Sequence, residues 1–391
     1  MIMVSIWCSA CSSLNVSNSD RNSVEEAAYD SVILYEENPN LRLSLGQGSQ
    51  HAQPQFQVKP GRSCDKYKTS HPSKICEPNY KVKVSTVPTS LSTIADFYAK
   101  PYGYDIEIPQ VSFNQKQLII AVLDTGIDLR LHPELKQYLW VNKGEIPNNG
   151  IDDDNNGYID DINGWNFIHN QSDLTDDSGH GTHVSGTILS VIAQNPNVKL
   201  MVLKFMHNNQ GNIGNAMKAI NYAINNGAQL SNHSYITEGY SQQFENNIKV
   251  AQYNNHILIA SAGNEGQNVD DQPKYPASFK VNNIITVGAL NSNHQRALFS
   301  NYGSDVDIFS PGVSIKSLGV RSQYSYQSGT SMAAPFVTGI LGLGITSSIQ
   351  DIMNLKSIIL NTTDINNAIN VAGFISNIQD SFICWSPENN N

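Results

Sequence analysis

Short runs of apolar residues recur along the chain from about residue 115 onward. They occupy residues 118–123, 200–206, 257–262, 284–288 and 306–309. Continuous runs of this length are typical of buried strands, and they suit a parallel sheet that is covered on both faces. The pattern therefore predicts a parallel sheet at the core of the molecule.

Amphipathic stretches lie between these runs. Apolar residues recur at helical spacing across 213–224 and 244–251, whereas residues 331–345 are small or apolar almost all round. The first two stretches predict helices with one buried face, and the third predicts a fully buried helix. The alternation predicts an α/β fold with a mainly parallel sheet and helices on both faces. In such folds functional groups collect at the carboxyl ends of the strands.

The N-terminal part has a different texture. Residues 1–10 are apolar, lack a basic start and lead into Cys11. Residues 1–20 are therefore either a truncated signal or lipoprotein-like start, or an ordinary disordered beginning. Residues 12–82 are polar, with little periodicity. No run in the chain approaches the roughly 18 apolar residues of a membrane-spanning helix, so we expect no transmembrane span.

Composition narrows the classes of function. The chain has 391 residues, enough for one large domain with an appendage. Only 15% of them are charged, against about 25% in typical soluble domains. The net charge of −10 repels phosphate groups and disfavours nucleic acid as a partner. The low charge and the many Asn, Ser and Gly residues favour a secreted or cell-envelope protein, lipid-anchored if the start is lipoprotein-like.

The five cysteines do not follow a metal-binding pattern. Cys64 and Cys76 lie close together in a loop-like segment and are candidates for a disulfide, whereas Cys384 is left over. The spacing excludes both a disulfide scaffold and a CxxC…CxxC metal site.

Asp124 and His180 are the first two residues with candidate chemistry. Asp124 ends the first predicted strand in an Asp-Thr-Gly sequence, which fits a plain strand exit or an aspartic protease equally well. The aspartic mechanism needs a second such motif of matching context, and none appears. His180 lies between two glycines, with Ser178 as a candidate N-cap. His183 follows one turn later and is expected to be structural, and the spacing excludes an HExxH metal pair.

Ser331 and Asn264 each follow a tight glycine turn. Ser331 begins the buried helix, where the helix dipole and free N–H groups stabilise negative charge; the alternative role is a simple N-cap. Asn264 closes another predicted strand, where its amide can donate to an oxyanion; the alternative is ordinary turn chemistry.

Together, in the order Asp…His…Asn…Ser, these motifs make the chain resemble the subtilisin-like serine proteases, or subtilases. The resemblance covers roughly residues 83–378. Further matching segments are residues 132–135, 275–278, 299–303 and 310–313. It implies a subtilisin-like fold and a serine endopeptidase. Two rivals remain: a catalytically silent scaffold that binds a partner, and an esterase or acyl transferase that uses the same triad.

The resemblance also implies the roles of the four residues. Ser331 attacks the peptide carbonyl, His180 transfers the proton, and Asp124 orients and stabilises the imidazole. The Asn264 side chain and the Ser331 N–H bind the oxyanion. Because the general base must be neutral, activity is expected to fall below about pH 6.5, the ordinary value for histidine.

Substrate contacts are implied for four residues, namely Ser234, Tyr235, Ile236 and Gly263. In this family the substrate backbone adds as a strand, here along residues 232–236 and facing residues 207–211. The family usually has glycine at or beside the position of Ile236. We therefore expect a crowded primary pocket and a narrow choice of substrate side chains.

An acidic insert is a candidate calcium site. Five of its residues follow the spacing of an EF-hand loop, namely Asp152, Asp154, Asn156, Tyr158 and Asp160. The bidentate Glu at the twelfth position is missing, because Asn163 stands there. Some subtilases carry a similar insert, and the alternative is a solvated acidic loop.

The resemblance divides the chain into parts. Residues 21–82 stand where exported subtilases carry a pro-region that assists folding and inhibits the enzyme intramolecularly; the alternative is a disordered spacer. Residues 83–378 form the catalytic domain, and residues 379–391 form a polar tail. Autocatalytic cleavage is expected between about residues 80 and 100, which would make the chain a zymogen.

Overall fold

The computed structural model describes residues 29–35, 56–61, 64, 67, 74–84, 117–192, 195, 197–346 and 352–361. The predicted features at residues 1–20 and 379–391 lie outside these ranges. Among the described residues, no helix combines the length and the apolar character needed to cross a membrane.

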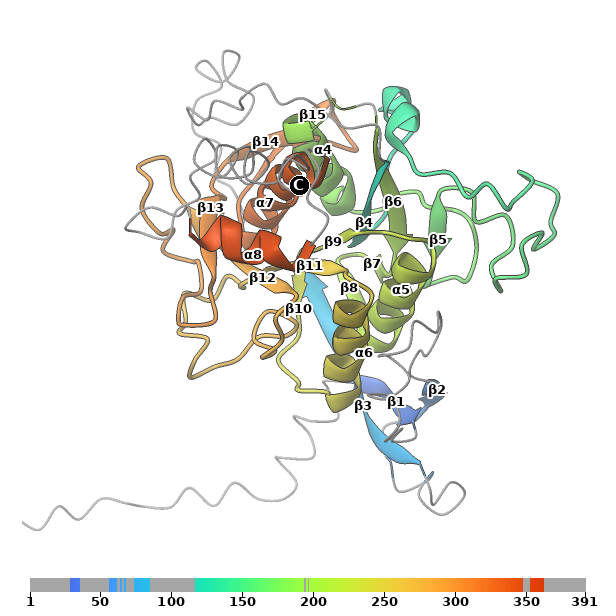
Figure 1. Ribbon diagram of the computed structural model, residues 1–391, viewed down its shortest axis with the longest axis horizontal. Helices are drawn as coiled ribbons and strands as arrows, with labels where there is room; N and C mark the ends of the chain where they lie inside the picture. The colour runs from blue at the N-terminus through green and yellow to red at the C-terminus, as the bar shows by residue number, and fades with distance from the viewer. Residues whose placement is uncertain are drawn as a thin grey trace, which may run out of the picture.

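A seven-stranded parallel sheet lies at the centre, as the apolar runs predicted (Figure 1). Its order is β13-β12-β11-β9-β4-β6-β5, and every neighbouring pair is parallel. The strands are β4 (Leu118–Asp124), β5 (Gly164–Asn166), β6 (Val198–Lys204), β9 (Leu230–His233), β11 (Ile257–Ser261), β12 (Ile284–Leu290) and β13 (Ile308–Pro311). From β4 the chain turns to β6 on one side and later to β9 on the other, so the crevice of this sheet lies at the carboxyl end of β4.

Helices cover both faces of the sheet. They are α4 (His180–Ile192), α5 (Ile213–Asn225), α6 (Gln242–Tyr253), α7 (Thr330–Thr346) and α8 (Ile352–Leu360). Along β4, Ile120 and Val122 belong to the apolar cluster that contains α4 and α7. Ala121 and Leu123 belong to the cluster that contains α5 and α6. Because successive strand residues point to opposite faces, this division confirms the predicted two-sided burial.

A second sheet joins the N-terminal segment to the edge of the crevice. It contains β1 (Tyr29–Tyr35), β2 (Phe56–Pro60), β3 (Ile75–Val84), β7 (Met206–His207), β8 (Gln210–Asn212) and β10 (Tyr235–Ile236). The sequence contains no periodic signal for β1, β2 or β3. The run from Val32 to Leu34 is fully buried, and a short apolar run inside a long polar segment leaves no periodic signal.

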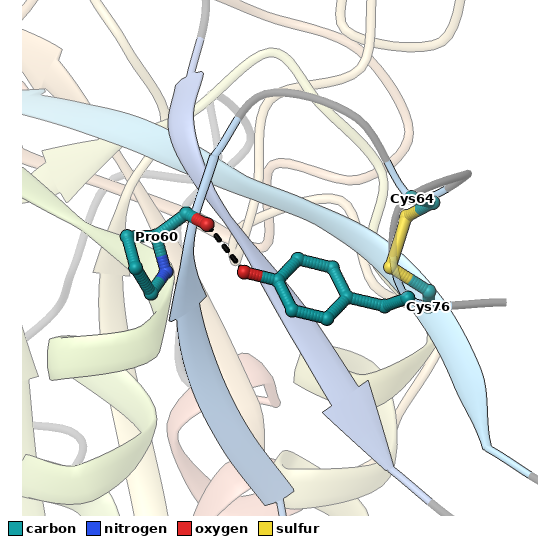
Figure 2. The surroundings of a disulfide bond; sticks show 4 residues. Pro60, Cys64 and Cys76 are labelled. Carbon is teal, nitrogen blue, oxygen red and sulfur yellow. Dashed lines mark hydrogen bonds between the residues drawn. A yellow bond between two sulfur atoms is a disulfide. The ribbon is translucent and has the colours of Figure 1, made fainter. Parts of the chain in front are cut away.

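The predicted disulfide is present. Cys64 is joined to Cys76 of β3, and the nearby Tyr67 hydroxyl donates to the Pro60 carbonyl at 2.5 Å (Figure 2). These contacts tie the loop between β2 and β3 to the small antiparallel sheet.

Several boundaries differ from the prediction. The apolar run at 200–206 is divided, because β6 ends at Lys204 and β7 begins at Met206. The last strand of the sheet begins at Ile308 rather than 306. The 3₁₀-helix η3 (Pro133–Tyr138) and the hairpin of β14 (Ile315–Leu318) and β15 (Tyr324–Gln327) were not predicted.

Candidate active site

Asp124 and His180 form a buried pair at the carboxyl end of the central strand. Asp124 is the last residue of β4 and His180 the first of α4. His180 Nδ1 lies 2.7 Å from Asp124 Oδ1. Both side chains are buried, with exposed fractions of 2% for His180 and 1% for Asp124. With Nδ1 donating to the carboxylate, Nε2 carries the free lone pair. This nitrogen is buried and has no hydrogen-bond partner in the described part of the chain.

The start of α4 is held by Asp176. Its carboxylate accepts bonds from the backbone of Gly179 at 2.9 Å and from the backbone of Thr182 at 2.8 Å. The predicted N-cap, Ser178, instead accepts from the His180 N–H at 3.2 Å. Gly181 allows close packing, because a Cβ there would lie 2.4 Å from the Gly126 carbonyl. Asp176 is thus the residue that fixes the helix end carrying His180.

Ser331 lies at the start of the buried helix α7, which packs against α4 (Figure 1). Its hydroxyl donates to the Ser234 carbonyl at 3.0 Å. In return, the Ser234 hydroxyl donates to the Ser331 carbonyl at 2.9 Å. Gly329, with φ at 154°, makes the turn into the helix. Ser331 is therefore tied to the segment that follows β9.

Asn264 presents an unused amide donor beside the same helix. Its Oδ1 accepts from the backbone N–H and the hydroxyl of Thr330, both at 2.9 Å. These two bonds fix the orientation of the amide and leave Nδ2 buried without a partner in the described part of the chain. A buried donor without an acceptor is costly, so this nitrogen is suited to an acceptor that a bound molecule supplies. Gly263, with φ at 100°, forms the turn before it.

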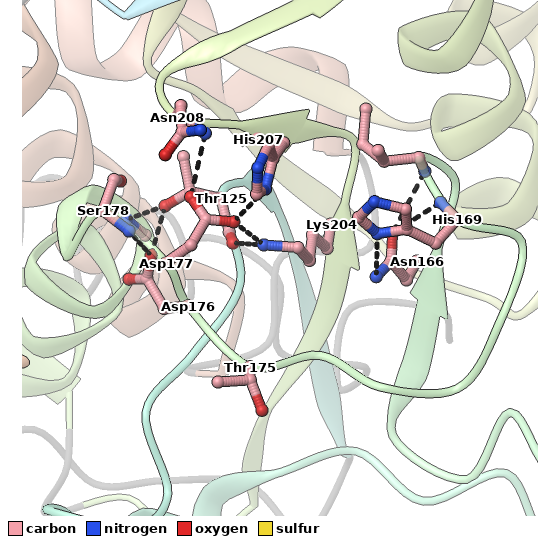
Figure 3. A network of polar contacts seen from close by, with 12 residues as sticks. Thr125, Asn166, His169, Thr175, Asp176, Asp177, Ser178, Lys204, His207 and Asn208 are labelled. Atoms are coloured by element: carbon pink, nitrogen blue, oxygen red, sulfur yellow. Dashed lines mark hydrogen bonds and ion pairs between the residues drawn. The ribbon is translucent and has the colours of Figure 1, made fainter.

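A charged cluster that the sequence did not predict surrounds Thr125, the residue that follows Asp124 (Figure 3). Lys204, at the end of β6, donates to the Thr125 carbonyl and to the Asp177 carboxylate, both at 2.5 Å. His207 also lies 2.8 Å from that carboxylate. Burial alone would raise the pKa of Asp177, but the Lys204 ammonium and the Asn208 amide outweigh it and lower the pKa. The signal available in the sequence was the adjacent pair Asp176–Asp177, which stands two residues before the Gly179–His180 start of the motif.

Residues 81–84 of β3 lie between two edges of the crevice. On one side β3 pairs antiparallel with β10, where Lys83 faces Ile236 and Val84 faces Tyr235. On the other side it pairs antiparallel with β8 at residues 210–212. The two segments expected to bind a substrate strand are thus bridged by a strand of the same chain. Ser234, Tyr235 and Ile236 are all fully buried under it.

The acidic insert gathers only part of the predicted calcium set. Carboxylate oxygens of Asp152, Asp154 and Glu145 lie within 4.8 Å of one another, and Glu145 was not predicted. Asp160 instead accepts from the N–H groups of residues 149 and 150. The side-chain oxygen of Asn156, another predicted ligand, accepts from the Tyr158 N–H at 2.8 Å. Glu145 precedes Asp152, the first residue of the predicted loop, so EF-hand spacing could not include it.

His183 has the structural role expected of it. It is fully buried, and its Nε2 lies 2.9 Å from the Ile315 carbonyl. Burial lowers the pKa of His183 to about 3. The imidazole is therefore neutral under ordinary conditions and acts as a packed hydrogen-bond donor.

A parallel sheet with a His–Asp pair at its crevice and a serine at a helix start is the arrangement expected of a subtilisin-like serine hydrolase. The family model described as "Subtilase family" matches residues 115–376. The chain belongs to this family of serine endopeptidases.

Known relatives agree with this assignment. The chain is 30% identical to a thermophilic serine proteinase of Bacillus sp. (strain AK1) over 296 residues, which are 74% of this chain and 67% of that protein. It is 34% identical to subtilisin-like protease 1 of Plasmodium berghei (strain Anka) over 289 residues, or 66% of this chain. The match spans 48% of the Plasmodium protein, about half of its length.

Solved structures share the fold. The crystal structure of fervidolysin from Fervidobacterium pennivorans, a keratinolytic enzyme related to subtilisin, aligns with a TM-score of 0.65 at 19% identity. The alignment covers 89% of this chain and 61% of that chain. A lanthipeptide protease aligns with a TM-score of 0.56 at 20% identity, over 67% of this chain and 87% of that one. The subtilisin-like α/β architecture expected from the sequence is thereby confirmed.

Proposed function

We propose that this protein hydrolyses peptide bonds with Ser331 as nucleophile, His180 as general base and Asp124 as the residue that orients the imidazole. The buried 2.7 Å contact between His180 and Asp124 is the observation that carries this proposal. A carboxylate at Nδ1 fixes the tautomer in which Nε2 can accept a proton, and it stabilises the imidazolium that follows. His180 would then pass the proton to the leaving amine.

Asn264 and the N-terminus of α7 would stabilise the oxyanion. The orientation of Asn264 supports this role, because its oxygen is held by Thr330 while Nδ2 has no partner among the described residues. The N–H groups at the helix start add favourable dipoles. Donors that are already oriented need not reorganise when the tetrahedral intermediate forms.

Peptide substrates would bind as a strand between β10 and β8. The antiparallel pairing of β3 with both segments supports this geometry, because an extended backbone is already accommodated there. Strand addition uses backbone hydrogen bonds for affinity and side-chain pockets for specificity. Ile236 would narrow the primary pocket, as the sequence predicts.

The N-terminal sheet would act as a pro-region that inhibits the enzyme before processing. In addition to the β3 pairing, Glu77 accepts bonds from the Ser241 hydroxyl at 2.6 Å and from the Gln243 N–H at 2.9 Å, at the start of α6. Asn79 accepts from the Gly214 N–H at 2.7 Å, at the start of α5. Two helix N-termini of the catalytic domain are thus satisfied by the segment that would be removed.

Cleavage of the pro-region would fall between Ser85 and Thr86. Val84 is the last described residue of β3 and pairs with Tyr235. Extended by one residue past Val84, this antiparallel register would bring the next residue opposite Ser234, the residue bonded to Ser331. This position lies within the expected window of residues 80–100, most of which is outside the described residues.

Calcium would stabilise the acidic insert. The donor set fits, because Glu145, Asp152 and Asp154 offer clustered carboxylate oxygens and calcium prefers such ligands. In the described part of the chain none of the three forms an ion pair with Lys or Arg. Bound calcium would supply the missing positive charge and fix the loop, without entering the reaction.

The protein would work outside the reducing cytosol. The Cys64–Cys76 disulfide supports this, because structural disulfides persist in oxidising compartments. Secretion or attachment to the cell envelope would provide such a setting.

A fluorophosphonate probe tests the proposed activity. The unaltered chain should be labelled and should cleave a peptide p-nitroanilide, whereas Ser331→Ala should do neither. Absence of labelling in the unaltered, processed chain would indicate a silent scaffold, and cleavage of esters but not peptides would indicate an esterase.

A further inference from the structure

Four buried side chains form a line of hydrogen bonds behind the segment that would bind substrate. Tyr235 OH lies 2.7 Å from His233 Nδ1, and His233 Nε2 lies 2.7 Å from Ser231 Oγ. Ser231 Oγ also lies 2.7 Å from His256 Nε2, and His256 Nδ1 lies 2.7 Å from the Ala228 carbonyl. All four side chains are fully buried. We call this line the Tyr235–His256 relay.

The relay has one consistent direction. The Ala228 carbonyl can only accept, so His256 must carry its proton on Nδ1 and accept from Ser231 at Nε2. Ser231 then accepts from His233 Nε2–H, and His233 Nδ1 accepts from the Tyr235 hydroxyl. Every donor and acceptor in the line is used once, and a fully satisfied buried network is rigid.

The pKa values agree with neutral rings. Burial lowers the pKa of His256 to about 4, and burial with the neighbouring His256 lowers the pKa of His233 well below its ordinary value. Burial likewise raises the pKa of the Tyr235 hydroxyl, so it keeps the proton that it donates. Protonation of either histidine would replace an acceptor in the line with a second donor.

The opposite face of the same strand is bonded to the catalytic helix. The Asn232 amide donates to the Ser234 hydroxyl at 2.9 Å and accepts from Thr338 of α7 at 3.0 Å. Ser234 in turn is bonded to Ser331. Because alternate residues of a strand face opposite sides, the segment that would bind substrate is fixed from one side by α7 and from the other by the relay.

The ring at the end of the relay also connects to Asp124. Tyr235 packs edge-on against Phe205, with ring centroids 4.7 Å apart. The Phe205 N–H donates to the Asp124 carbonyl at 3.0 Å. The relay therefore holds a ring that lies between β10 and the strand end carrying the carboxylate.

We propose that His233 and His256 are positioning residues for peptide substrates, which hold Tyr235 and the backbone of β10 in the register that an incoming strand must meet. The proposal rests on the peptidase function proposed above. It predicts that damage to the relay affects substrates that pair with β10 more than it affects the acyl-transfer chemistry.

Kinetics of Tyr235→Phe provide the first test, because this change keeps the ring and removes the donor to His233. For a peptide substrate with four residues before the cleaved bond, kcat/KM should fall about tenfold, mainly through KM. That is about 1.4 kcal/mol, within the range for leaving a buried acceptor without its donor. For a single-residue ester, which does not reach along β10, kcat/KM should fall less than twofold.

Tyr222→Phe is the matched control. Tyr222 is also buried, and its hydroxyl donates to the Asp161 carboxylate at 2.6 Å, away from β10. This variant should lose thermal stability but keep the ratio of peptide to ester activity. If Tyr235→Phe lowers both activities equally, or leaves both unchanged, the positioning role is refuted.

Histidine tautomers provide the second test, which is read from the protein with the relay intact. In full-length Ser331→Ala labelled with ¹⁵N-histidine, we expect His233 as the Nε2–H form and His256 as the Nδ1–H form at neutral pH. His233→Gln and His256→Gln assign the signals. Reversed or doubly protonated rings would overturn the relay. If the unaltered chain fails to react with a fluorophosphonate, the peptidase function fails, while the tautomers still decide the relay.

Discussion

Ser234 and Ser331 each donate a side-chain hydrogen bond to the backbone carbonyl of the other, at 2.9 and 3.0 Å. This reciprocal contact joins the segment proposed to bind substrate to the residue proposed to attack it. The Ser331 hydroxyl proton points to the Ser234 carbonyl. His180 Nε2, in contrast, has no hydrogen-bond partner in the described part of the chain. In the proposed reaction, a substrate N–H would donate to the Ser234 carbonyl in place of the Ser331 hydroxyl. The hydroxyl would then be able to rotate and donate to His180 Nε2.

Ser234→Ala should therefore lower kcat about tenfold. The variant loses the bond that holds the Ser331 backbone, and one such bond contributes about 0.5–1.5 kcal/mol. Steady-state kinetics on a peptide substrate check this. Ser190→Ala is the control, because Ser190 also bonds a carbonyl, that of Thr187, but lies on α4 away from the crevice. Equal kcat in both variants would contradict the role of the contact.

Asn264→Leu should lower kcat about 10²–10³-fold with little change in KM, a magnitude known from the corresponding change in subtilisin rather than derived from this structure. Leucine keeps the volume and removes the donor that would meet the oxyanion. Asn268→Leu serves as a control outside the site. A loss confined to KM would assign Asn264 to ground-state binding instead.

N-terminal sequencing of the processed protein should find Thr86 as the first residue. The reason is the register of β3 against β10, which pairs Val84 with Tyr235 and, extended by one residue, would bring Ser85 opposite Ser234. Ser331→Ala should remain unprocessed, as a control for self-cleavage. A first residue well beyond this point, for example near residue 100, would mean that β3 does not occupy the crevice as a substrate does.

Calcium removal should lower the melting temperature of the unaltered chain. Glu145→Gln should have a lower melting temperature in calcium and a smaller response to a chelator, because the clustered carboxylates lose one charge. Glu134→Gln, an exposed change on η3, is the control and should respond to the chelator like the unaltered chain. A melt that no chelator shifts would leave the insert as a loop held by its own hydrogen bonds.

The folded protein should lose stability in mild acid. Burial lowers the pKa of His183 to about 3 and that of His256 to about 4, whereas an unfolded histidine takes up a proton near pH 6.5. As pH falls below about 6.5, only the unfolded chain gains these protons. Each histidine then lowers the free energy of unfolding by about 1.4 kcal/mol per pH unit, until its folded pKa is reached.

Urea unfolding of Ser331→Ala between about pH 7 and pH 4.5 measures this slope. In the Ser331→Ala background, His183→Gln should flatten it, because glutamine can still donate to the Ile315 carbonyl but takes up no proton. His294→Gln, at an exposed position, should not. Equal slopes in all three proteins would show that His183 does not contribute to the acid limit.

The sequence predicted the part of the fold that depends on local pattern. The apolar run at 118–123 is the central strand within one residue, and the helix at 213–224 is observed as Ile213–Asn225. The motifs also located the four residues of the candidate site. Each motif lies at the carboxyl end of a strand or at a helix start. In a parallel sheet these ends lie at the same edge, so segments that are distant in sequence come together there.

Contacts between distant segments could not be predicted in this way. Glu145 joins the acidic insert from outside its spacing pattern, and Asp177 meets Lys204 across 27 residues of sequence. The same is true of His233, because nothing in its local sequence pattern indicates that it takes part in the relay. The strand β3 could not be predicted because it pairs with β8 and β10, and no local pattern records a partner that is more than 100 residues away.

The strand in the crevice has one further consequence. Because β3 belongs to the same polypeptide, dilution cannot release it, and its effective concentration at the crevice is set by the linking chain. Once that link is cut, the same contact becomes an encounter between two molecules. Inhibition by the released segment would then weaken as its concentration falls. The onset of proteolysis would therefore depend on the volume into which the protein is diluted, as well as on whether it has been cut.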